Sequence, residues 1–80
     1  MNTAQTYSER VASEVRAQLA RAGKDGGDLA AILGVSRPTA LGRWRGATTY
    51  TLDELDAIAS ALSIPVAAIV LPGIEQATAA

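Results

Sequence analysis

Apolar residues recur along most of this chain at the three- and four-residue spacing of an α-helix. The first such set is Val11, Val15 and Leu19. Thr6 and Glu9, which precede this set, have the spacing of a capping box, in which each side chain bonds the backbone N–H of the other residue. Gly23 supplies the left-handed residue with which many helices end. The pattern therefore predicts a helix over residues 7–22.

Two shorter helices are predicted next. Asp25 and Asp28 are suited to cap the first of them, and Gly34 is suited to close it. The apolar face of this helix consists of Leu29, Ala30, Ile32 and Leu33. Ser36 is a favoured N-cap for the other helix, which is predicted to run from about Ser36 to Arg45 and to end at the glycine that follows.

Two more helices complete the pattern. Thr51 and Glu54 form a second capping box. The helical apolar positions that follow are Leu52, Leu55, Ile58, Ala59 and Leu62. A last, short apolar helix is predicted over residues 66–71, because Pro72 and Gly73 are expected to halt it.

Composition supports a helical fold. Of the 80 residues 49% are hydrophobic, but there is no Phe and only one Trp, so aliphatic side chains must fill the core. We expect an all-α, compact bundle of five short helices in one domain, residues 7–72, between flexible ends at 1–6 and 73–80. The absence of Cys and His excludes a disulfide and any Cys- or His-based metal or catalytic site, and no cofactor is expected. No signal peptide or membrane-length apolar run is visible, so a cytoplasmic protein is expected.

The charges are unevenly distributed, although the net charge is only -1. Residues 1–28 carry four bases and four acids, and residues 51–80 carry four acids and no base. Residues 29–50, the basic segment, carry no acid and three bases, which are Arg37, Arg43 and Arg45. A basic segment in an otherwise neutral to acidic chain favours a local surface for nucleic acid.

The junction between the second and third predicted helices fits a tight crossing. Helices joined by three or four residues cross steeply, which requires a small residue where their backbones approach and a glycine at the corner. Ala30 and Gly34 meet these needs, Val35 can fill the angle, and Ala40 can face inward. The pattern therefore predicts a central helix-turn-helix.

With these features the chain resembles the Cro/lambda-repressor-type (XRE-like) helix-turn-helix family, and within it the small regulators of actinobacteria and their phages. The resemblance covers about residues 7–71. It rests on residues 29–39, which include Leu-Gly-Val-Ser-Arg, on Gly46, and on the segments 52–65 and 9–16. It implies a lambda-repressor-like DNA-binding domain whose third helix enters the major groove with its N-terminal residues at the base edges.

Most candidate DNA contacts lie in the third helix and in the loop that follows it, and one lies just before the second helix. They are Ser36, Arg37, Pro38, Thr39, Gly42, Arg43, Arg45, Thr48, Thr49 and Lys24. Arg37 can bond O6 and N7 of guanine together, worth about 1–3 kcal/mol of discrimination, and Thr39 can bond a base edge. Gly42 would either allow close approach to DNA or simply lack a contact. Arg43 and Arg45 suit phosphates or a second base, and the hydroxyls of the loop, Tyr50 included, suit phosphates.

Each of these assignments has a structural alternative. The three arginines could form an ordinary solvated face, but the helix-turn-helix context favours DNA contact for at least two of them. Trp44 could stack on a base, but its spacing from Ala40 and Leu41 favours the core. Arg43 stands where many family members carry a core residue, which predicts a slightly rotated buried face of the third helix.

We expect a sequence-specific transcriptional regulator that binds double-stranded DNA, of the phage or prophage Cro or repressor kind, and not an enzyme. The alternative is a protein-binding helix-turn-helix module, such as an antitoxin- or antirepressor-like partner. The apolar stretch at residues 65–74 serves either as a dimer surface or as a seal on the monomer's own core. The expected state is a monomer or weak homodimer that pairs on DNA, with no membrane partner and no small-molecule ligand.

Overall fold

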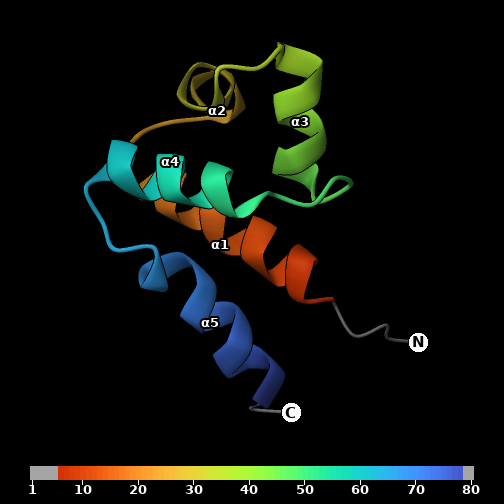
Figure 1. Ribbon diagram of the computed structural model, residues 1–80, viewed down its shortest axis with the longest axis vertical. Coiled ribbons are helices and arrows are strands. Elements are labelled where there is room, and N and C mark those ends of the chain that lie inside the picture. Colours follow the sequence, from red (N-terminus) through yellow and green to blue (C-terminus); the bar gives the residue numbers. More distant parts are fainter. Residues whose placement is uncertain (1–5, 79–80) are drawn as a thin grey trace.

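Five α-helices account for most of the described chain, residues 6–78 of a computed structural model, and these residues contain no strand (Figure 1). The helices are α1 (Tyr7–Arg21), α2 (Gly26–Leu33), α3 (Arg37–Arg45), α4 (Leu52–Leu62) and α5 (Ala67–Thr78). The expected all-α bundle is confirmed. The flexible ends expected at residues 1–6 and 73–80 fall partly outside the described residues, and their flexibility stays a prediction.

Local capping places the first four helices where the sequence predicts them. The side-chain oxygens of four N-cap residues accept backbone N–H groups of the first turns, and these residues are Thr6, Asp25, Ser36 and Thr51. Gly34 and Gly46 cap the ends of α2 and α3 with φ values of 68° and 83°, in the left-handed region where a side chain is strained. The ends of the helices around the basic segment are therefore fixed by single residues.

The predicted stop at Pro72 is wrong, because α5 runs through it to Thr78. A proline inside a helix removes one hydrogen bond, but packing of the same helix can offset that loss. α5 packs along α1, with Ile69 fully buried, and the Tyr7 hydroxyl donates to the Val70 carbonyl at 2.9 Å. Packing against α1 therefore holds the helix where local sequence favours an end.

Of the two roles considered for the apolar C-terminal stretch, α5 fills the second: it seals the monomer's own core. Val66, just before α5, and Leu71 within it remain partly exposed. A homodimer stays a prediction.

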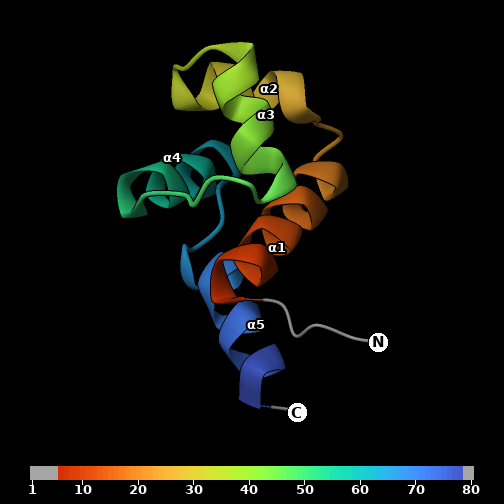
Figure 2. The same ribbon diagram turned by 90° about the vertical axis from the view of Figure 1, so that its right-hand side faces the viewer.

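α1 is the central element of the bundle and packs against α3, α4 and α5, while α2 packs against α3 and α4. Figures 1 and 2 show α2 and α3 at one end of the molecule and α1 with α5 toward the other. The buried core is aliphatic apart from one tyrosine: Val11, Ala12, Val15, Leu19, Leu29, Ala40, Tyr50, Leu55, Ile58, Ala59 and Ile69. Val35 and Trp44 are partly buried and pack against this core, as predicted.

Two positions depart from the predicted core. Leu52, assigned to the buried face of its helix, is 82% exposed, although Leu55 in the same turn of α4 is buried. Tyr50, assigned to a phosphate-contacting loop, is only 8% exposed and belongs to the core, so a phosphate contact from its hydroxyl is wrong.

Ser63 at the end of α4 provides a test of local strain. Its φ of 56° places a residue with a side chain in the left-handed region, and Ser63 is exposed. Because glycine adopts this conformation freely but loses more entropy on folding, Ser63→Gly is expected to raise the free energy of unfolding by about 0.5 kcal/mol. Urea unfolding followed by circular dichroism measures this change. The control is Ser60→Gly in the exposed interior of α4, which should lower stability by about 0.5 kcal/mol. A stability change of the same sign in both variants would contradict the strain assigned to Ser63.

Candidate nucleic-acid interface

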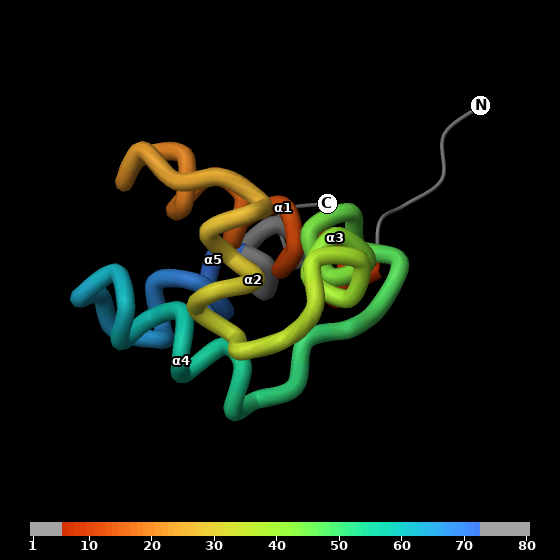
Figure 3. The backbone as a smooth tube through the Cα atoms, turned by 90° about the horizontal axis from the view of Figure 1, so that it is seen from above, coloured from red at the N-terminus to blue at the C-terminus, as the bar shows by residue number. Residues whose placement is uncertain are grey.

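The basic segment contains the last five residues of α2, all of α3 and the loop that follows, and α2 packs closely on α3. Figure 3 views α3 nearly end-on, with α2 running beside it. Ala40 is fully buried on the inner side of α3. A Cβ added at Gly26, in the first turn of α2, would lie 3.2 Å from Leu41 Cδ2 and 3.6 Å from Trp44 Cδ2. Gly26 therefore permits the close approach of the two helices, a role that sequence reasoning missed.

The first turn of α3 is exposed along its whole length. Ser36, Arg37, Pro38 and Thr39 are all solvent-accessible. The Ser36 Oγ accepts the Thr39 backbone N–H at 3.3 Å and donates its own hydrogen to Thr39 Oγ1 at 2.9 Å. As a result the Thr39 hydroxyl keeps its hydrogen for another acceptor, while Ser36 is committed to the cap.

Arg37 lies over the first turn of α2. Its guanidinium nitrogens are 3.4 and 3.6 Å from the position that a Cβ on Gly27 would occupy. The backbone N–H of Asp28, the N–H of Gly27 and the nearby Arg37 together hold the pKa of Asp25 below its ordinary value. Asp25 is thus a carboxylate beside the leading arginine, and sequence reasoning identified it only as a helix cap.

The second half of α3 faces the loop that follows it. The backbone N–H groups of Ala47 and Thr48 donate to the Gly42 carbonyl at 3.0 and 3.2 Å. A Cβ on Gly42 would lie 3.3 Å from Thr48 Oγ1, so the space beside this glycine holds the loop. The close approach of DNA predicted at Gly42 is therefore replaced by close approach of the chain itself, whereas Thr48 and Thr49 remain exposed.

Arg43 is turned toward α4. Its Nε lies 2.7 Å from Glu54 Oε1, with 17% and 16% of the two side chains exposed. Partial burial alone would raise the pKa of Glu54, but the hydrogen bonds from Arg43 and Thr51 outweigh it, and the pKa lies below the ordinary 4.5. Arg43 is thus engaged within the protein, and its DNA contact stays an untested prediction that this geometry does not favour.

A second arginine also binds α3 from within the bundle. Arg16 of α1 donates from Nη1 to the carbonyl oxygen of Trp44 in the last turn of α3. Cations near a helix C-terminus are stabilised by its exposed carbonyls. No short-range signal in the sequence links these two residues, which are 28 positions apart.

The predicted contacts thus separate into two exposed groups. The first is the leading turn of α3, residues 36–39, and the second consists of Arg45, Thr48 and Thr49 beyond its far end. Lys24 is exposed just before α2. Within residues 6–78, Arg37, Arg45 and Lys24 form no ion pair. These three cations are the exposed part of the predicted set that could meet an anionic partner, although Arg37 also lies near Asp25.

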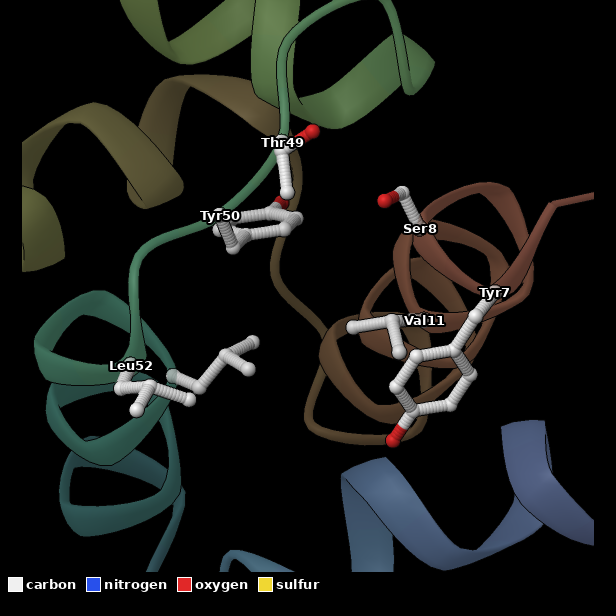
Figure 4. A pocket seen from close by; sticks show the side chains of 7 residues that line it. Tyr7, Ser8, Val11, Thr49, Tyr50 and Leu52 are labelled. Atoms are coloured by element: carbon white, nitrogen blue, oxygen red, sulfur yellow. The ribbon is translucent and has the colours of Figure 1, made fainter.

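An apolar pocket of about 200 Å³ lies between α1 and the start of α4 and adjoins the second exposed group at Thr49 (Figure 4). Side chains of Tyr7, Val11, Tyr50, Leu52 and Leu55 form most of its wall.

The described residues hold no cluster of three acidic, Cys or His side chains that could bind a metal ion. Nor does any helix among them combine the length and apolar character needed to cross a bilayer.

Comparisons with protein-family models, with curated proteins and with solved structures gave no match for this chain.

Proposed function

We propose that this protein is a sequence-specific regulator that binds double-stranded DNA by inserting α3 into the major groove. The observation that carries the proposal is the exposed first turn of α3, residues 36–39, on a helix whose opposite side packs through Ala40. An α-helix with side chains is about 10–12 Å across, which matches a major groove about 12 Å wide. The steep α2–turn–α3 arrangement supports docking of the helix-turn-helix kind.

In this proposal the two exposed groups have different tasks. Arg37 reads a guanine through O6 and N7, and Thr39 donates to a base acceptor. Arg45, Lys24 and the hydroxyls of Thr48 and Thr49 bind backbone phosphates. With two cations on phosphates, the slope of log K against log salt concentration is expected to be about -2 per protomer.

The regulatory role rests on the sequence resemblance to Cro/lambda-repressor-type proteins. We propose a transcriptional regulator of the phage or prophage kind, which acts by occupying an operator. Two protomers would then pair on adjacent half-sites, as the symmetry of such operators requires.

The test is a fluorescence anisotropy titration of DNA fragments that flank the protein's own gene, against a scrambled duplex at about 0.1 M salt. Arg37→Ala is expected to weaken binding to the preferred fragment about tenfold and to scrambled DNA much less, because one bidentate base contact is lost. Arg45→Ala should weaken both about equally and reduce the salt slope by about 1.

The matched control is Arg21→Ala, which removes the same charge from α1, where Arg21 lies 3.6 Å from Glu14. Binding by this variant should change less than twofold. A wild-type protein that binds every fragment and the scrambled duplex equally would overturn the proposed function, as would an Arg21→Ala loss equal to that of Arg37→Ala.

One observation favours the alternative of a protein-binding module. Leu52 is strongly exposed beside the apolar pocket of Figure 4, and Tyr7 lies partly exposed on the opposite wall. An exposed leucine next to an apolar pocket suits a protein partner better than DNA. Absence of any DNA preference, combined with stable folding, would favour this alternative.

A further inference from the structure

Arg43 is the middle one of the three arginines in the basic segment, and its side chain is largely buried, whereas Arg37 and Arg45 are exposed. Its guanidinium meets Glu54, 11 residues away in α4, at 2.7 Å. Both side chains are more than four-fifths buried. An ion pair that is largely removed from water is screened less by salt than a pair on the surface.

The same oxygen of Glu54 accepts a second hydrogen bond. Its Oε1 accepts the backbone N–H of Thr51 at 2.9 Å, and its own N–H donates to Thr51 Oγ1 at 3.1 Å. One carboxylate oxygen therefore joins the N-cap of α4 to a side chain of α3. The loop over residues 46–51 connects the same two helices, so the ion pair closes a short ring of chain around them.

The last turn of α3 is held from the other side as well. Arg16 of α1 donates to the Trp44 carbonyl, next to Arg43 in the sequence. The last turn of α3 is thus tied by side-chain hydrogen bonds to α1 and to α4, whereas its first turn is exposed and rests on α2. The direction in which the first turn points is therefore set by these two hydrogen bonds together with the packing of α2 on α3.

We propose that Arg43 and Glu54 are a positioning pair, which sets the orientation of α3 against the bundle and leaves DNA contact to Arg37 and Arg45. This inference rests on the proposed function and deepens it, because orientation matters only if the first turn of α3 reads a target. Its consequence is that Glu54, an acid outside the basic segment, controls sequence discrimination without touching DNA.

Two substitutions separate positioning from contact. Arg43→Gln removes the pair, and the specific affinity is expected to fall about three- to tenfold while the salt slope stays as in the wild type, because no phosphate contact is lost. Glu54→Gln keeps an oxygen that can accept the capping N–H, since glutamine also serves in capping boxes, but removes the negative charge that holds Arg43 in the ion pair. Binding to scrambled DNA should then strengthen, and discrimination should fall about three- to tenfold.

The experiment measures the dissociation constants of wild type, Arg43→Gln, Glu54→Gln, the double variant and Arg45→Gln, each on target and scrambled duplexes at four salt concentrations. Arg45→Gln is the matched control, with the same substitution two residues along α3, and its slope should drop by about 0.9. A double variant that discriminates no worse than Arg43→Gln alone supports the pair, because partners in one interaction are not additive.

The outcomes are distinguishable. A slope reduced in Arg43→Gln as much as in Arg45→Gln would make Arg43 a phosphate contact and overturn the inference, while the proposed function stands. Unchanged discrimination in Glu54→Gln would also overturn it. If Arg43→Gln fails to fold by circular dichroism, the discrimination of Glu54→Gln decides. A wild type without target preference overturns the proposed function and this inference together.

Discussion

Replacing Leu29 with alanine is expected to lower the free energy of unfolding by about 3 kcal/mol, within the range of about 2–5 kcal/mol for such core truncations. Leu29 is fully buried, and it is the large side chain by which α2 enters the core. An 80-residue domain has a stability of only about 4–12 kcal/mol, so this loss removes a large share of it. Because α2 carries α3, weaker binding to DNA near the melting temperature should accompany the loss.

Urea unfolding followed by circular dichroism at 222 nm measures this effect. The chain offers a matched control in Leu52→Ala, which deletes the same atoms from a side chain that is 82% exposed. The control should change stability by less than about 0.5 kcal/mol. Similar losses at the two positions would show that the burial assigned to Leu29 and the exposure assigned to Leu52 are wrong.

Replacing Tyr50 with phenylalanine is expected to raise the free energy of unfolding by about 1–2 kcal/mol. Among the described residues the buried Tyr50 hydroxyl has no hydrogen-bond partner. Leaving a buried polar group unsatisfied costs about 1–3 kcal/mol, and an apolar group of the same shape removes that cost. The gain should appear in the urea midpoint at neutral pH.

The control is Tyr7→Phe, because the Tyr7 hydroxyl donates to the Val70 carbonyl at 2.9 Å and joins α1 to α5. Its loss should lower stability by about 0.5–1.5 kcal/mol, the opposite sign. A loss of stability in both variants would mean that the Tyr50 hydroxyl is satisfied in solution.

Tyr50→Phe is also expected to change how stability depends on pH in alkaline solution. Burial raises the pKa of Tyr50 above its ordinary value of 10.0, although the charges of nearby Arg16 and Arg43 act in the other direction. The folded state therefore holds this proton more tightly than the unfolded state does. Wild-type stability should fall as pH rises above 10, and Tyr50→Phe should fall less steeply.

Helix boundaries were predictable because capping is local. The hydroxyl of Thr6 and the carboxylate of Glu9 are three residues apart, and the reciprocal bonds between them depend on little else. The same holds for Thr51 and Glu54. The end of α5 was not predictable in this way, because the continuation of the helix through Pro72 depends on packing against a helix some 60 residues earlier in the chain.

The candidate site was predictable only in part, for a related reason. Exposure at Arg37 and Thr39 follows from their place in the first turn of a helix that packs through Ala40. Arg43 carries the same charge as Arg37, but its partner lies in another helix, and only the assembled bundle brings the two together. Tyr50 lies in no helix, so periodicity gave no information about its burial.

The pairing of α1 with α5 has a practical consequence for how this molecule can be attached to others. The start of α1 and the last turn of α5 lie at the end of the bundle remote from α2 and the first turn of α3 (Figures 1 and 2). A dye attached to the start of α1 or to the last turn of α5 would lie at the end of the bundle opposite the exposed turn of α3. Single-molecule and immobilised formats should therefore leave that turn accessible to whatever it binds.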